Sequence, residues 1–203
     1  MVETQLIERG IRNPLVLSAM RSVPRHEFVP QILQEKAYYD SPLPIGYRQT
    51  ISQPYIVAFM TEKLRPKPGD RVLEVGTGSG YQAAVLSRLV KEVYTIEIVE
   101  PLARSAAAAL KRAGCDNVFV RAGDGYRGWP EKAPFDSVIV TAAPEHVPKP
   151  LIDQLKEGGK MVIPLGAEFQ IQTLKVFSKQ EGILVLESTL PVRFVPMTGE
   201  AQK

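Results

Sequence analysis

Hydrophobic and polar positions follow two different patterns along the chain, and the change falls near residue 70. From Arg71 onward, short apolar runs alternate with amphipathic segments, which is typical of a parallel sheet covered on both faces by helices. The predicted strands are 71–75, 93–98, 118–122, 135–141 and 160–164, and the helices between them are 81–90, 101–113 and 150–156. This spacing predicts a doubly wound α/β sheet.

The end of the chain departs from this alternation. Two apolar runs, 171–178 and 183–190, are separated by only a few residues around Gly182. A connection that short permits only a hairpin. We therefore expect this last pair of strands to be antiparallel.

The first seventy residues show helix signals in place of alternating strands. Asn13-Pro14 is a typical cap and first turn, and Pro24 ends that segment. Residues 41–54 are rich in proline and are interpreted as an ordered loop. We expect a single domain over 1–203, in which residues 1–70 form a helical lid with the active-site loop and residues 71–203 form the core and the hairpin.

Composition and charge exclude several classes of protein. With 203 residues, 44% of them hydrophobic, the chain is that of a globular protein with a full core. The net charge of +3 is scattered and does not indicate a nucleic-acid partner. Cys115 is the only cysteine, so no internal disulfide is possible, and His26 and His146 have no partner at metal-ligand spacing. No stretch approaches 18 apolar residues and no signal peptide is evident, so we expect a cytoplasmic monomer with no metal and no membrane partner.

The strongest candidate site is the glycine-rich turn that runs from Glu74 to Gly80. It follows a predicted strand and opens a helix, so that glycines allow a ligand close to the backbone and the helix presents unpaired amides. A turn that merely needs small residues is the alternative. Glu97, 21 positions after Gly76, ends the next strand, where a carboxylate can accept hydrogen bonds from both ribose hydroxyls.

Spacing and charge decide between two cofactor classes for this turn. Only Ser79 separates Gly78 from Gly80, whereas a dinucleotide site has two residues there. Glu74 would repel a diphosphate but tolerate the cationic sulfonium of S-adenosylmethionine. Asp124, between Gly123 and Gly125, can accept a bond from the adenine amine, although a surface Asp-Gly turn is the alternative. The sequence therefore predicts an S-adenosylmethionine-dependent methyltransferase.

The loop after the fourth strand, Ala142-Ala143-Pro144, contains only small residues. Methyltransferases that act on base nitrogens typically have an Asn/Asp-Pro-Pro-aromatic tetrad here. A flipped base is therefore not the expected acceptor. Small residues leave space for a substrate group beside the methyl donor, although a tight connection would also require them.

Together with these features, four further stretches resemble the protein-L-isoaspartate (D-aspartate) O-methyltransferase family. They are Val23-Pro24-Arg25 with Phe28-Val29-Pro30, Leu43-Pro44-Ile45-Gly46, residues 49–54, and Arg193-Phe194-Val195-Pro196-Met197. The resemblance covers about residues 6–198, and residues 49–54 are the part specific to the family. It implies a Rossmann-like class I fold and methyl transfer to the free carboxylate of L-isoaspartyl and D-aspartyl residues in damaged proteins, which initiates their repair.

Three other functions stay open on the residues alone. A class I methyltransferase of a small molecule or RNA would keep the glycine turn. A non-enzymatic cofactor-binding module of the same fold would bind S-adenosylmethionine without methylating anything. An oxidoreductase fits the turn least well.

The resemblance also implies the roles of individual residues. Ser52 is the active-site residue, whereas the residues alone interpret it as a helix N-cap before Pro54. The implied cofactor-binding residues are Thr50, Ile51, Ser52, Glu74, Gly76, Thr77, Gly78, Glu97, Gly123, Asp124, Gly125 and Thr198. The implied substrate-binding residues are Ile45, Gly46, Ala142, Ala143 and Val195. Tyr38, Tyr39 and Trp129 are as readily explained by packing.

Overall fold

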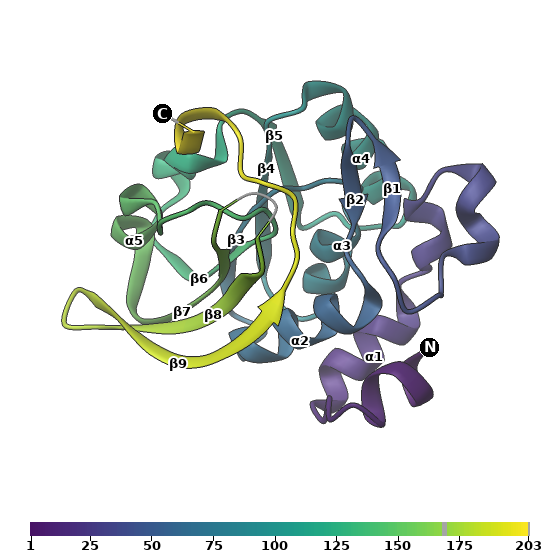
Figure 1. The fold of residues 1–203 in the computed structure, drawn as a ribbon, viewed down its shortest axis with the longest axis horizontal. Helices are drawn as coiled ribbons and strands as arrows, with labels where there is room; N and C mark the ends of the chain where they lie inside the picture. The colour runs from purple at the N-terminus through teal and green to yellow at the C-terminus, as the bar shows by residue number, and fades with distance from the viewer. Residues whose placement is uncertain (168–169, 203) are drawn as a thin grey trace.

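A seven-stranded sheet forms the centre of the computed structural model, which describes residues 1–167 and 170–202. Its strands lie in the order β5-β4-β3-β6-β7-β8-β9 (Figure 1). The strands are β3 (Arg71–Val75), β4 (Glu92–Glu97), β5 (Val118–Ala122), β6 (Phe135–Val140), β7 (Leu155–Leu165), β8 (Gln172–Gln180) and β9 (Ile183–Val192). The first five are parallel and the last two are antiparallel, which confirms the predicted sheet and hairpin.

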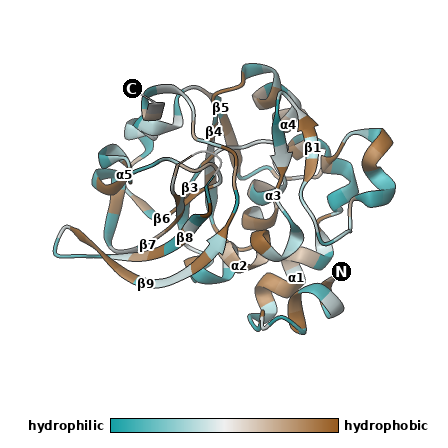
Figure 2. Ribbon diagram, viewed as in Figure 1, coloured by the Kyte–Doolittle hydropathy of each residue, from teal (hydrophilic) through white to brown (hydrophobic). Residues whose placement is uncertain are grey.

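The central strands are apolar because both of their faces are buried. In β3, Val72 packs into the hydrophobic cluster on one face of the sheet and Leu73 into the cluster on the other. Figure 2 shows hydrophobic residues along the central strands and mixed colours on the edge strand β9. Helices cover the sheet: α1 (Pro14–Ser22), α2 (Pro54–Leu64), α3 (Tyr81–Ser87), α4 (Glu100–Arg112) and α5 (Lys149–Gln154).

The strand order reverses between β3 and β6, and this reversal positions the site. β3 pairs with β4 on one side and with β6 on the other, all parallel. The connections after these strands therefore diverge and leave a crevice at their carboxyl ends. The glycine turn that follows β3 lies at this crevice.

Most predicted boundaries are confirmed within a few residues, but β7 begins five residues before the predicted start at Lys160. Leu155 already pairs with Phe135, and the register then shifts before Ser137 pairs with Lys160. Gly158 within this irregularity has a φ of 75°, so the chain crosses a bulge without leaving the sheet.

Residues 41–54 are not the strandless loop that the sequence indicates. They contain an antiparallel hairpin of β1 (Leu43–Gly46) and β2 (Gln49–Ile51). Its turn residues Tyr47 and Arg48 both have positive φ, 52° and 59°. Such a turn is normally signalled by Asn-Gly, and that signal is missing here.

Short helical segments complete the fold around the helices and strands. Asn13 caps α1 through its side chain, as predicted. Among the described residues, no helix is long and apolar enough to cross a bilayer. The segments are η1 (Val2–Ile7), η2 (Arg25–Phe28), η3 (Gln31–Lys36), η4 (Gly125–Arg127), η5 (Pro130–Lys132) and η6 (Gly199–Gln202).

Candidate active site

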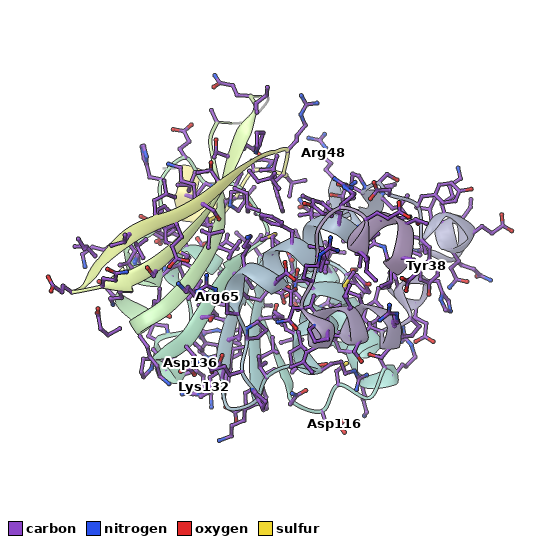
Figure 3. The ribbon with its side chains drawn as sticks, turned by 90° about the horizontal axis from the view of Figure 1, so that it is seen from below. Tyr38, Arg48, Arg65, Asp116, Lys132 and Asp136 are labelled. Carbon is purple, nitrogen blue, oxygen red and sulfur yellow. The ribbon has the colours of Figure 1, made fainter. Side chains whose placement is uncertain are left out.

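A cavity lies at the carboxyl edge of the parallel strands, on the side where the β1–β2 hairpin covers the sheet. Figure 3 shows Arg48 at the tip of this hairpin and Asp136, near the start of β6, on opposite sides of the molecule. The cavity brings together eight of the predicted site residues: Thr50, Gly76, Gly78, Glu97, Gly125, Ala142, Val195 and Thr198. Ile96, Ile98 and Thr141, which the sequence did not single out as site residues, also line it, together with Val75 of the glycine turn and with Gln49, Pro196 and Met197 from the stretches that carry the family resemblance.

The glycine turn has a backbone that other residues rarely adopt. Gly76, Gly78 and Gly80 have φ values of 96°, 53° and 90°. A Cβ atom on Gly76 would lie 2.4 Å from Oγ1 of Thr141, whose hydroxyl donates a hydrogen bond to the Gly76 carbonyl at 2.6 Å. Gly76 is therefore required by both conformation and space, and Gly78 and Gly80 are favoured by conformation.

Glu97 is a buried carboxylate whose position is fixed by backbone amides. One oxygen accepts a hydrogen bond from Gly78 N at 2.8 Å, and the other accepts one from Val99 N at 2.9 Å. Its side chain lines the cavity at the end of β4. It ties the glycine turn to the neighbouring strand, in the place where the sequence predicts a ribose-binding carboxylate.

Glu74 contrasts with Glu97, because the structure places it behind the cavity wall and not in it. It is completely buried, and neither carboxylate oxygen has a hydrogen-bond partner among the described residues. Burial raises the pKa of Glu74 to about 8; the nearby Thr95 hydroxyl opposes this rise, and the charge of Glu97 adds to it. The protein therefore holds Glu74 mainly as the neutral acid at neutral pH.

Asp124 and Gly123 also lie outside the cavity wall, in a neighbouring hollow that shares Ile96 with the cavity. Asp124 accepts a hydrogen bond from Tyr126 N at 2.9 Å, which caps η4, and one from Glu200 N at 2.8 Å. Asp124 thus makes the capping hydrogen bond that is expected under the alternative interpretation, a surface Asp-Gly turn. The segment η6 covers this carboxylate, held further by the ion pair of Arg127 with Glu200.

Ser52 lies in a second hollow that adjoins the cavity. Thr50, Thr141 and Val195 line both spaces. The prediction that Ser52 caps α2 is wrong, because Pro54 is the first helical residue and Gln53 occupies the cap position without a side-chain cap bond. The Ser52 hydroxyl makes no hydrogen bond within the described ranges, so it is available to a ligand.

Arg25 holds the backbone of Ser52 in place from inside the protein. It is fully buried, and it donates hydrogen bonds to the carbonyls of Ala37 and Ser52, both at 2.7 Å. Its guanidinium lies 4.8 Å from the ring centroid of Tyr81, and burial lowers the pKa of Arg25 to about 10. Sequence reasoning noticed Arg25 only as part of a motif and missed this role.

The C-terminal strap, which we define as residues 193–198, crosses the cavity after β9. Ala143 N donates to Val195 O at 2.8 Å, and Met197 N donates to Ala143 O at 2.9 Å. Gln172 fixes the strap further by accepting from Phe194 N and donating to Phe194 O. The predicted substrate residue Ala143 is thus buried against the strap.

The remaining predicted residues lie at the margins of the site. Ile51 and Thr77 line a small space beside the cavity, together with Ser52. The side chain of Ile45 reaches the glycine turn, where a Cβ on Gly78 would lie 3.4 Å from Ile45 Cδ1. Gly46 is exposed at the hairpin turn and has no contact with these spaces in the described structure.

Comparisons with known proteins agree over nearly the full chain. A family model described as protein-L-isoaspartate(D-aspartate) O-methyltransferase matches residues 1–202. A protein-L-isoaspartate O-methyltransferase from Opitutus terrae is 60% identical over 98% of this chain and 86% of its own. One from Gloeobacter violaceus is 54% identical over 98% of both chains.

Solved structures give the same result. A protein-L-isoaspartate O-methyltransferase with 32% identity has a TM-score of 0.88 and covers 99% of this chain and 67% of its own. A putative protein-L-isoaspartate O-methyltransferase from Plasmodium falciparum, in complex with S-adenosyl-L-homocysteine, has 28% identity and a TM-score of 0.84. That alignment covers 97% of this chain and 96% of the other.

Proposed function

Because the chain belongs to the protein-L-isoaspartate(D-aspartate) O-methyltransferase family, we propose that it methylates the free carboxylate of isoaspartyl and D-aspartyl residues in damaged proteins. The methyl donor is S-adenosylmethionine, and the methyl ester initiates repair. The observation that carries the proposal is the adjacency of two spaces. The cavity beside the glycine turn adjoins the hollow that contains Ser52.

The charge of the cavity fits the proposed cofactor. Glu97 is its only charged lining residue within the described ranges, and no lysine or arginine lines it. Such a wall attracts a cationic sulfonium and repels a diphosphate. When bound, S-adenosylmethionine supplies an electrophilic methyl group. We propose that Glu97 binds the ribose and that the other cavity residues predicted for the cofactor hold it, whereas Glu74 and Asp124, which lie outside the cavity wall, support the segments around it.

The acceptor requires little activation by the protein. A carboxylate is already ionised at neutral pH, so no general base is needed. We propose that the Ser52 hydroxyl donates a hydrogen bond that orients this carboxylate. Arg25 holds the Ser52 backbone, so the hydroxyl is presented by a fixed loop. Orientation of this kind can contribute ~7–11 kcal/mol to catalysis.

We propose that the peptide lies along the strap and the β1–β2 hairpin. Ile45, Gly46, Ala142 and Val195 would contact it, and Ala143 would act by holding the strap at Val195 and Met197. We also propose that the protein acts as a cytoplasmic monomer without a nucleic-acid partner.

The test of this function uses paired peptides that differ only in Asp or isoAsp at one position. The protein is incubated with each peptide and with cofactor labelled on the transferred methyl group. We expect label on the isoAsp peptide alone. Equal labelling of both peptides, or labelling of neither, would contradict the proposal.

The role of Ser52 is tested by Ser52→Ala. Loss of one hydrogen bond to a charged acceptor is expected to lower kcat about 10- to 100-fold. Cofactor affinity should fall far less than kcat, because the proposed bond goes to the acceptor, and thermal stability should change little, because the hydroxyl makes no hydrogen bond in the described structure. An unchanged kcat would remove Ser52 from the reaction.

A further inference from the structure

The hollow that contains Ser52 is lined by charged residues of one sign. Arg9 and Arg193 are its only charged lining residues among those that the structure describes, and no carboxylate lines it. Arg9 belongs to the N-terminal segment and Arg193 to the strap, so two segments that lie far apart in the sequence line the same hollow. A peptide that occupies this hollow therefore lies beside two cations.

Arg9 is fixed in place by two neighbours. Its guanidinium carbon lies 3.6 Å from the ring centroid of Tyr55, and Nη1 donates to Asp40 Oδ2 at 2.9 Å. These contacts leave Nε and Nη2 without a bond in the described part of the chain. A guanidinium held flat in this way can donate to a carboxylate with little further loss of conformational freedom. Asp40 offsets part of its charge.

Arg193 has a fixed backbone neighbour and an unpaired side chain. Phe194, the next residue, is held by two hydrogen bonds with Gln172, which is itself buried. The side chain of Arg193 is exposed and makes no ion pair or hydrogen bond within residues 1–167 and 170–202. Its charge has no counterion there, so we expect it to contribute more than Arg9 to the potential in the hollow.

We propose that Arg9 and Arg193 select acceptors by the charge of the residues that flank the isoaspartyl group. Peptides with an acidic flanking residue bind better than neutral ones, and peptides with a flanking lysine bind worse. This rests on the proposed function, because it takes the hollow to be the peptide site. Electrostatic attraction across an interface acts on encounter and affinity, so the preference appears in KM and not in kcat.

The experiment uses three isoAsp peptides that differ at one flanking position, with Glu, Gln or Lys. Initial rates give kcat and KM for each peptide at low ionic strength. We expect KM to rise in the order Glu, Gln, Lys, with about a three- to tenfold ratio between the extremes. The ratio should shrink in about 0.5 M NaCl, where the Debye length is only about 4 Å. Equal KM values for the three peptides would overturn the inference.

Three variants and one control test which arginine causes the difference in KM. Arg193→Gln is expected to reduce the Lys-to-Glu ratio of KM values by about threefold, and Arg193→Lys should retain most of it. Arg9→Gln should reduce the ratio less, and its thermal unfolding is measured because Arg9 also holds Tyr55 and Asp40. Arg104→Gln, on the exposed face of α4, is the matched control and should leave the ratio unchanged.

The outcomes separate this inference from the proposed function. An undiminished ratio in both Arg193→Gln and Arg9→Gln would overturn the inference while leaving methylation of isoAsp intact. Absence of any isoAsp-specific methylation of the Gln peptide would overturn the proposed function and the inference with it.

Discussion

The two sides of the site are built in different ways. The floor consists of the glycine turn and the carboxyl ends of β4 and β6, and regular backbone pairing on both sides of β3 holds it. The cover consists of the β1–β2 hairpin, Ser52 and the strap. Individual side chains hold the cover by bonds to backbone atoms, Arg25 at Ser52 and Gln172 at Phe194.

This difference separates stability from turnover. Many backbone hydrogen bonds together stabilise the floor. Its geometry is therefore lost only when a substituted residue cannot adopt the local backbone conformation. In the cover, the loss of one side chain can release a whole segment from its position. Substitutions in the floor should therefore affect folding and cofactor binding together, whereas those in the cover should act mainly on the acceptor.

The largest effect is expected for Gly76→Ala in the floor. The added methyl group meets Oγ1 of Thr141, and the φ of 96° strains any other residue. We expect a stability loss of about 2–4 kcal/mol and loss of measurable cofactor binding, tested by chemical unfolding and calorimetry. Gly69→Ala is the control, because its Cβ would meet no atom within 4 Å. Normal cofactor affinity in Gly76→Ala would contradict the close approach of ligand to this turn.

Arg25→Met tests whether one substitution in the cover can destabilise the protein as strongly as one in the floor. It removes two hydrogen bonds from a buried cation and leaves the carbonyls of Ala37 and Ser52 without donors. We expect a stability loss of about 2–4 kcal/mol and a lower kcat in the protein that remains folded. Arg21→Met, an exposed arginine paired with Glu3, should show neither. A normal kcat together with lowered stability would show that Arg25 contributes to folding and not to turnover.

Glu74→Gln tests the buried acid of the floor through pH. A carboxyl whose pKa is raised on folding stabilises the protein fully below its unfolded pKa, and this stability is lost as pH rises through the folded value of about 8. Between these two pKa values the wild type should lose about 1.4 kcal/mol per pH unit relative to the variant. Urea unfolding across this range measures the difference. Parallel stability curves would show that Glu74 is ionised, and the exposed Glu8→Gln is the control.

Gln172→Leu is expected to have the smallest effect. It releases the strap at Phe194 without changing the floor, so KM for the isoAsp peptide should rise about threefold and stability should fall by about 1–2 kcal/mol. Peptide titrations of initial rate measure the KM. Gln180→Leu, at the exposed end of the same strand, is the control. If cofactor affinity fell by a larger factor than KM rose, the strap would contribute more to cofactor binding than to peptide binding, as the floor does.

Prediction from the sequence succeeded where local pattern and local geometry coincide. Strands 71–75 and 118–122 were predicted at their observed bounds. Such strands are apolar runs between turn residues, and backbone hydrogen bonds to the neighbouring strands then fix their position in the sheet. The hairpin β1–β2 was missed because Tyr47 and Arg48 occupy turn positions that usually signal themselves with glycine.

The amino-acid sequence by itself determined the doubly wound sheet, the glycine turn and the carboxylate at Glu97, because each depends on spacing along a few dozen residues. Only the tertiary structure decided three other features of the site. These are the neutral state of Glu74, the hydrogen bond of Arg25 to the Ser52 carbonyl, and the placement of Arg9 and Arg193 at the same hollow. Burial and long-range contact create them, and no local pattern in the sequence encodes either.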